Sequence, residues 1–221
     1  MKPDGLFWIV FLSAAGITGW LYFYAKVWLP KHLDERLQES VKAFSTAVEL
    51  RFPSHAGLSA RVEKLSVRVG RQLGLNENQL RDLSLAATLR DVGLCSIPYA
   101  LVNHRPVNTW SSADFSTYFQ HAKIGSAMLE MIPSLRRLAP VVAQHHEPYD
   151  SKDGLPNRHA RILHVVTDYL WVERRQGDFL ARKHLKDLSG TEFDPEVVQA
   201  LLAVLTSNPD VKEREAAIPA L

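Results

Sequence analysis

The chain is poor in cysteine and has no strong excess of either charge. Its 221 residues include one cysteine, Cys95, so an internal disulfide and a CxxC zinc site are both excluded. The formal net charge is +2 and the charges are spread along the chain, which gives no case for binding a nucleic acid polymer. A chain of this length can form one well-packed domain in addition to a membrane segment, but hardly two.

Charged residues are also missing between Gly5 and Ala25, within an apolar run that continues to Leu29. About 20 apolar residues are enough to cross a bilayer. Aromatic residues lie toward both ends of the run, as at membrane interfaces: Trp8, Trp20, Tyr22, Tyr24 and Trp28. We expect an N-terminal tail over residues 1–5 and a transmembrane anchor over residues 6–29. The alternatives are a buried core helix and a secretory signal peptide, whose apolar core is shorter, about 7–15 residues.

The positive charges on the two sides of this anchor are unequal. One lysine, Lys2, precedes the uncharged stretch from Gly5 to Ala25, and four basic residues follow that stretch: Lys26, Lys31, Arg36 and Lys42. Because positively charged flanks favour the cytoplasmic side, we expect a single-pass protein of the inner (cytoplasmic) membrane. Its C-terminal domain would then lie in the cytoplasm.

Residues 30–54 are predicted to form an amphipathic linker helix. Apolar residues recur at spacings of four and three, which is typical of a helical stripe: Leu33, Leu37, Val41, Phe44 and Val48. The stripe over residues 31–50 can pair with a second copy as a short coiled coil, giving a homodimer. Packing against its own domain is the alternative.

The rest of the chain shows no sustained strand alternation, so we expect an all-α domain over residues 55–206, followed by a frayed tail over 207–221. Capping residues mark several helix starts, with Asn76 and Gln79 as a pair and Asp194 before Pro195. Gly74 is a stop signal. The predicted helices cover residues 57–73, 80–89, 111–131, 134–146, 156–174 and 195–205.

Five side chains from four different predicted helices or helix ends are candidate metal ligands: Asp91, His121, His145, His146 and Asp168. Imidazole nitrogens and carboxylates together bind divalent ions and leave room for water and a phosphate. These ligands converge only if the helices form a bundle. Taken singly, a histidine is more often a surface or core residue than a ligand.

The chain resembles the HD-GYP domain family, the branch of the HD phosphohydrolase superfamily associated with cleaving cyclic di-GMP. The resemblance covers residues 55–206 and keeps its order and spacing throughout. It is carried by Ala86-Ala87-Thr88-Leu89-Arg90-Asp91-Val92-Gly93, Ile97-Pro98, His121-Ala122-Lys123-Ile124-Gly125, His145-His146-Glu147, Gly154-Leu155-Pro156, Arg161-Ile162-Leu163 leading to Asp168, and Ser189 through Val198. The resemblance implies a helical fold and a dinuclear metal site.

This chain departs from the family pattern at several site positions. Leu58 stands where the first histidine is expected, and Arg90 replaces the histidine of the His-Asp pair. Leu94 replaces a lysine, and the substrate loop Gly154-Leu155-Pro156 has leucine in place of tyrosine. His55 lies one helical turn before Leu58. It can take the place of the missing family histidine only if the register of the helix shifts.

In the family's ligand assignment, the ligand residues that this chain lacks belong mainly to one of the two metal ions. The first ion keeps only Asp91 and Asp168, whereas the second keeps Asp91, His121, His145 and His146. We therefore expect one divalent ion, such as iron or manganese, or none. The Arg90 guanidinium is expected to replace the missing cation by pairing with Asp91 or Asp168. The alternative is a solvent-facing Arg90 in a domain kept only for its fold.

Three functions remain open. The favoured one is a membrane-anchored, degenerate signalling, nucleotide-binding or scaffolding module with weak or no hydrolysis, whose partner is a cyclic dinucleotide or a protein. The second is an active metal-dependent phosphohydrolase resembling a cyclic di-GMP phosphodiesterase, with His55 recruited. The third is a structural subunit of a membrane assembly.

Overall fold

The structure is a computed structural model that describes residues 4–152 and 154–207. The predicted tails over residues 1–5 and 207–221 therefore lie largely outside the described residues. Within these ranges the chain forms helices and no strand, with one isolated bridge between Ser189 and Phe193. The prediction of an all-α protein is confirmed. The chain divides into two compact units, residues 1–43 and 44–221.

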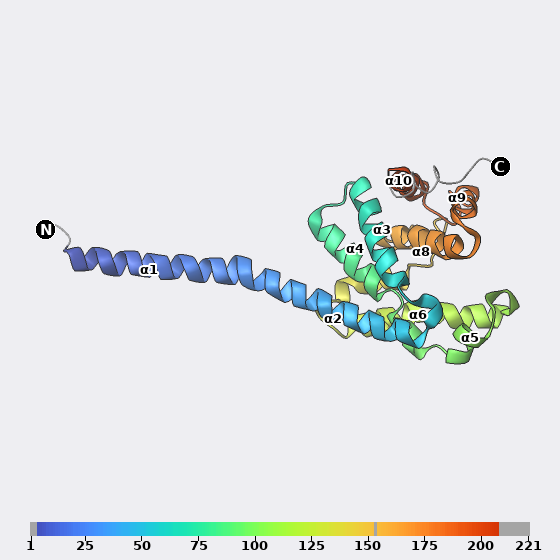
Figure 1. The fold of residues 1–221 in the computed structure, drawn as a ribbon, viewed down its shortest axis with the longest axis horizontal. Coiled ribbons are helices and arrows are strands. Elements are labelled where there is room, and N and C mark those ends of the chain that lie inside the picture. The colour runs from blue at the N-terminus through green and yellow to red at the C-terminus, as the bar shows by residue number, and fades with distance from the viewer. Residues whose placement is uncertain (1–3, 153, 208–221) are drawn as a thin grey trace, which may run out of the picture. The chain divides into compact units, whose positions relative to one another are not determined.

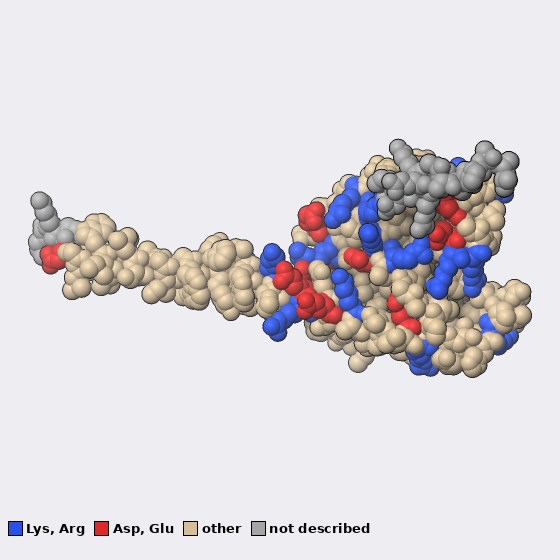
Figure 2. All heavy atoms as spheres, viewed as in Figure 1, with Lys and Arg blue, Asp and Glu red and all other residues tan. Residues whose placement is uncertain are grey.

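The first unit contains α1 (Gly5–Phe23), a π-helical turn (Tyr24–Trp28) and most of α2 (Leu29–Arg51). Every side chain of α1 is exposed, and Figure 2 shows α1 without a lysine, arginine, aspartate or glutamate. The helix is long and apolar enough to cross a membrane. An apolar helix exposed on all sides is compatible with a membrane anchor. Pairing of a second copy through residues 31–50 stays a prediction.

The second unit is a bundle of helices joined by short 3-10 turns, coloured from cyan to red in Figure 1. Its core consists mainly of the packing of α3 on α4 and α8, of α6 on α7, and of α8 on α9. The elements are η2 (Pro53–His55), α3 (Leu58–Gln72), α4 (Glu77–Leu89), η3 (Val92–Ser96), α5 (Tyr99–His104), η4 (Val107–Thr109), α6 (Ser112–Glu130), η5 (Arg136–Leu138), α7 (Ala139–Ala143), α8 (Arg158–Gln176), α9 (Asp178–Asp187) and α10 (Pro195–Thr206).

Local side-chain chemistry accounts for several of these boundaries. The Asn76 side chain accepts from the backbone N–H of Gln79, whose own side chain accepts from the Asn76 N–H, so the predicted capping pair is confirmed. Asp194 caps α10 by accepting from the Glu196 N–H. Gly74 follows α3 with a φ of 74°, a left-handed conformation that favours glycine.

The prediction of one helix over residues 134–146 is wrong. The segment forms η5 and the five-residue α7 instead, and Gln144 ends α7 with a φ of −101° and a ψ of 4°. Pro140 cannot continue a preceding helix, because it has no N–H and restricts the residue before it. His145 and His146 therefore lie in a turn. The short helices α5 and α9 were not predicted, because neither is long enough to show a sustained apolar period.

One close backbone approach joins η3 to α6 next to the candidate site. A Cβ atom on Gly93 would lie 2.0 Å from the carbonyl oxygen of His121 and 2.7 Å from the backbone nitrogen of Gly125. These distances leave no room for any side chain. Glycine at position 93 therefore allows Asp91 to lie beside His121.

We expect Gly93→Ala to lower the free energy of unfolding by about 3 kcal/mol or more, because backbone atoms cannot move aside for a methyl group. Gly125→Ala is the control, since its Cβ would meet two side-chain methyl groups at 3.1 and 3.2 Å, which can adjust, and the Gly93 backbone nitrogen only at 3.3 Å. Thermal unfolding of both variants, followed by circular dichroism in detergent, measures the difference. Equal losses in the two variants would contradict the role given to Gly93.

Candidate functional site

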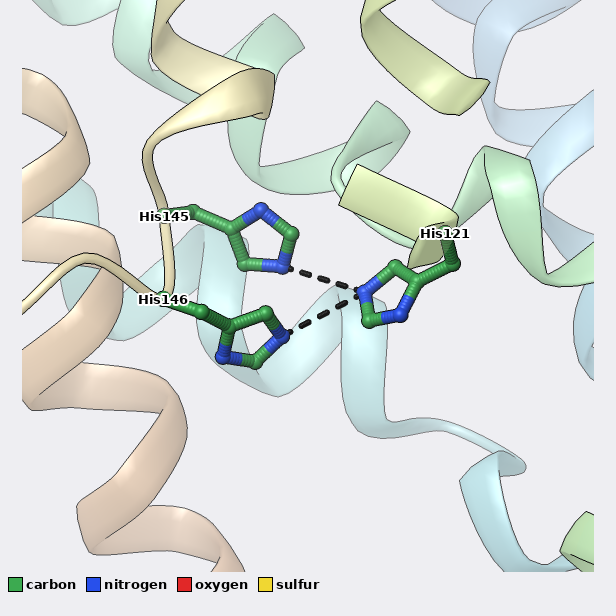
Figure 3. Close-up of side chains that lie close together, drawn as sticks. All are labelled: His121, His145 and His146. Atoms are coloured by element: carbon green, nitrogen blue, oxygen red, sulfur yellow. Dashed lines mark hydrogen bonds between the residues drawn. The ribbon is translucent and has the colours of Figure 1, made fainter. Parts of the chain in front are cut away.

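Three histidine side chains converge inside the second unit. His121 comes from α6, and His145 and His146 come from the turn after α7; Figure 3 shows their rings pointing toward one another. The Nε2 atom of His121 lies 3.3 Å from the Nε2 atoms of both His145 and His146. One ligand nitrogen from each ring lies within 4.8 Å of the other two. His121 and His145 are completely buried.

Backbone carbonyls orient two of these rings. Nδ1 of His121 lies 2.6 Å from the carbonyl oxygen of Tyr118, and Nδ1 of His145 lies 2.7 Å from that of Val142. A carbonyl only accepts, so each Nδ1 donates, and each Nε2 carries a lone pair. Two lone pairs that face each other at 3.3 Å repel, and a cation relieves that repulsion. Nδ1 anchored to a carbonyl with Nε2 free is also the usual state of a metal-ligating histidine.

The surroundings keep these histidines neutral, as metal ligands must be. Burial lowers the pKa of His145 to about 3, with His121 adding to the effect. Burial likewise lowers the pKa of His121, although the charge of Asp91 opposes it. The pKa of His146 falls well below its ordinary value through burial and its two histidine neighbours. The donor set therefore fits a divalent cation.

Asp91 contributes a carboxylate at the edge of this group. Its Oδ1 lies 3.6 Å from Nε2 of His121, and its Oδ2 lies 2.6 Å from Nη2 of Arg90. Burial raises the pKa of Asp91, but the Arg90 guanidinium and the neighbouring imidazoles outweigh burial and hold the pKa below its ordinary value. The carboxylate is therefore ionised and able to bind a cation.

Arg90 is among the largest side chains that are completely buried, so the alternative of a solvent-facing Arg90 is wrong. Its Nη1 donates to the carbonyl oxygen of Ala87 at 2.8 Å. Nη2 makes the short contact with Asp91 as an ion pair rather than an aligned hydrogen bond, and Nε has no hydrogen-bond partner among the described residues. Of the two carboxylates proposed from the sequence, Arg90 pairs with Asp91.

The structure places His55 at the same site. It ends the 3-10 turn after α2, is 3% exposed, and lines a pocket together with Asp91. Its Nδ1 lies 3.0 Å from Ser54 Oγ, and its Nε2 lies 3.4 Å from the Tyr118 hydroxyl. Burial lowers the pKa of His55, with Asp91 opposing. Leu58 lines the pocket as well, so both the substituted position and the neighbouring histidine reach it.

Asp168 lies apart from the three-histidine group. It projects from α8, and its Oδ2 accepts a hydrogen bond at 2.6 Å from Nε2 of His184 on α9. A second pair lies nearby on the pocket wall, with Nε2 of His164 3.3 Å from Oε1 of Glu192. Sequence analysis missed His164, His184 and Glu192. Only the repeated histidines along α8 and α9 could have drawn attention to them.

The site opens into a pocket of about 470 Å³, which is large enough for a small organic ligand. Of the metal-ligand candidates, Asp91, His146 and Asp168 line it, and five aromatic side chains form an aromatic wall: Trp110, Phe115, Tyr118, Phe119 and Trp171. Leu94 does not line this pocket, because it packs in an apolar cluster with Phe52 and Ile97. Leu155 of the predicted substrate loop is exposed and also lies outside the pocket lining.

Sequence relatives are phosphodiesterases of cyclic dinucleotides. The chain is 29% identical over 185 residues to the cyclic di-GMP phosphodiesterase response regulator RpfG of Xanthomonas campestris pv. campestris (strain 8004), covering 77% of this chain and 48% of the relative. It is 30% identical over 170 residues to a cyclic di-GMP phosphodiesterase of Thermotoga maritima, covering 70% and 46%. The chain thus spans about half the length of the curated relatives it matches.

Solved structures support the fold. A cyclic GMP-AMP specific phosphodiesterase of V. cholerae matches with a TM-score of 0.59 and 18% identity, over 83% of this chain and 54% of that one. The HD domain of the L. monocytogenes phosphodiesterase PgpH, in complex with cyclic-di-AMP, matches with a TM-score of 0.53 and 13% identity, over 74% and 95%. A family model for the HD domain matches residues 42–197, more than half of the sequence. The resemblance is therefore confirmed, and the chain belongs to the HD domain family.

Proposed function

We propose that this chain is a membrane-anchored, metal-dependent phosphodiesterase that acts on a cyclic dinucleotide through a one-ion centre. The observation that carries the proposal is the convergence of three histidine rings, two of them with Nδ1 anchored to backbone carbonyls, in a group that reaches a ligand-sized pocket through His146. The names of the relatives supply the ligand class: cyclic di-GMP and 3'3'-cGAMP phosphodiesterases.

His121, His145 and His146 would hold the ion, with Asp91 as a fourth ligand. Mixed imidazole and carboxylate donors suit iron, manganese or a similar divalent ion. Such an ion supplies Lewis-acid polarisation of a phosphoryl oxygen and activation of water. The carbonyl oxygens of Tyr118 and Val142 would keep the rings of His121 and His145 in the orientation that ion binding needs. The aromatic wall would limit the access of bulk water to the ion.

Arg90 balances charge at the position where the family pattern has a metal ligand. A guanidinium stays protonated and stabilises the buried Asp91 carboxylate, but it has no open coordination position and cannot activate water. We therefore expect turnover well below that of a centre with two ions, since both ions of a dinuclear site stabilise the reacting oxygens.

A receptor that binds the dinucleotide without cleaving it is the second candidate. The buried Arg90–Asp91 pair favours it, because that pair fills part of the site with a charge that cannot take part in hydrolysis. Leu94 favours it as well, since it packs in the apolar core and leaves no cation there to neutralise a phosphate.

Metal analysis and an activity assay on the same preparation separate these candidates. We expect the full chain, purified in detergent, to carry about one divalent ion and to cleave cyclic di-GMP or 3'3'-cGAMP with Mn²⁺ or Fe²⁺. His145→Ala should lose both properties, because a fully buried ligand is removed. His159→Ala is the matched control, since His159 is not a member of the three-histidine group. One ion without turnover would support the receptor, and protein without metal would refute the one-ion centre.

Restoring the family residue at position 90 tests the role of Arg90. We expect Arg90→His to raise the metal content from about one ion per chain toward two and to increase turnover, because a neutral imidazole can ligate an ion where a guanidinium cannot. Arg90→Lys keeps a positive charge and should stay at one ion. Plasma mass spectrometry of the folded variants gives the count. An unchanged count in Arg90→His would show that the arginine does not stand in for an ion.

We also propose that residues 6–29 anchor the chain in the cytoplasmic membrane, with residues 44–221 in the cytoplasm. The basic residues after the apolar segment support this orientation. A green fluorescent protein fused to the C-terminus should fluoresce in the membrane fraction, whereas an alkaline phosphatase fused there should be inactive. The reverse result, or a mature chain that begins after the apolar segment, would refute the proposal.

A further inference from the structure

The pocket contains one arginine that no carboxylate neutralises. Apart from histidines, its basic residues are Arg105 and Arg175. Arg105 is already paired, because Nη1 and Nη2 contact the two carboxylate oxygens of Asp114 at 2.7 and 2.9 Å. Arg175 makes no ion pair or hydrogen bond among the residues that the structure describes, and it is exposed to solvent. Its charge is therefore available to a ligand.

Trp171 holds this guanidinium in place. The Arg175 Cζ atom lies 3.8 Å from the centroid of the Trp171 ring, one turn earlier on α8. A guanidinium that lies over an indole ring gains from cation–π attraction and keeps the N–H groups at its edge free to donate. Arg175 is thus restricted in position and still has unused donors, which are the properties of an anion-binding group.

Asp168, Trp171 and Arg175 are spaced by three and four residues along α8, so they lie on one face of the helix, and all three line the pocket. Seven residues correspond to about 10 Å along a helix axis. Arg175 therefore lies about 10 Å along α8 from Asp168, whereas Asp91 and His146 reach the lining from other elements. A ligand with two phosphates would place one at the three-histidine group and the other at Arg175.

The rest of the pocket fits the groups that would join two such anions. Trp110, Phe115, Tyr118 and Phe119 form a connected set of ring contacts, with centroids 5.3 to 6.3 Å apart. Aromatic surfaces of this kind bind nucleobases by stacking. The lining thus combines a stacking wall, an ion-binding end and a fixed positive charge.

We propose that Arg175, positioned by Trp171, binds the phosphodiester of the dinucleotide that is not being cleaved, and so selects ligands with two phosphate groups. This inference rests on the proposed function, because it assumes that the other phosphate lies at the three-histidine group. Arg175 acts on ligand affinity rather than on the chemical step. It supplies the phosphate neutralisation that Leu94 cannot provide from the apolar core.

The test compares a ligand with two phosphates and a substrate with one. In Arg175→Ala we expect the Kd and KM for cyclic di-GMP or 3'3'-cGAMP to rise about 10- to 100-fold, because a hydrogen bond to a charged group is lost. The kcat should change little, and kinetics with bis(p-nitrophenyl) phosphate should stay the same. Arg175→Lys should recover part of the affinity, since it keeps the charge without the planar fork.

Arg136→Ala is the control, because Arg136 is an exposed arginine outside the pocket and only donates to the Glu130 carbonyl. Unchanged affinity in Arg175→Ala, or an equal loss with both substrates, overturns the Arg175 proposal and leaves the phosphodiesterase in place. Weaker binding in Arg175→Ala by a chain without turnover upholds the Arg175 proposal and refutes the enzyme. If the wild-type chain binds neither cyclic dinucleotide in calorimetry, both proposals fail.

Discussion

The site depends on keeping the Asp91 carboxylate ionised in the interior of the helical domain. A buried charge without a partner is costly, and the removal of one member of a buried pair costs about 3–5 kcal/mol. Arg90 provides the positive charge on one side of Asp91, and the His121 ring lies on the other. Because Arg90 is part of the chain, this half of the site is charge-balanced without a second ion. In the proposed one-ion centre, the three histidines would hold one Lewis acid in place of two.

Asp168, like Asp91, is paired with a side chain of the protein, although the family pattern assigns it to a metal ion. The family pattern assigns both Asp91 and Asp168 to the first ion, and in this chain each has a partner from the protein: Arg90 for Asp91 and His184 for Asp168. His184 comes from α9, which packs directly on α8. The substitutions at Leu58 and Arg90 thus form a consistent set with His184. By the family's ligand assignment, they fall on one ion, whereas His121, His145 and His146, which that pattern assigns to the other ion, lie together in this chain.

The sequence predicted the long helices and the grouping of His121, His145 and His146, and it failed where local patterns are weak. Capping pairs such as Asn76 with Gln79 define helix starts through short-range hydrogen bonds, so they can be read from the sequence. The break before His145 comes at Gln144, where no proline or glycine marks the end of an apolar segment that looks helical. The burial of Arg90 could not be predicted, because a charged residue at the end of a helix is usually exposed and only the tertiary packing decides otherwise.

In the predicted substrate loop, Gly154-Leu155-Pro156, the backbone and the side chain at position 155 lead to different conclusions. Gly154 has a φ of 104°, a conformation that requires glycine, so the turn itself is maintained. Leu155, however, is exposed and outside the pocket lining, so its side chain does not shape the space that a ligand would occupy. Residues 102–119 and the face of α8 that carries Trp171 do line that space. Under the proposed function, ligand selection would depend on these two walls rather than on the loop alone.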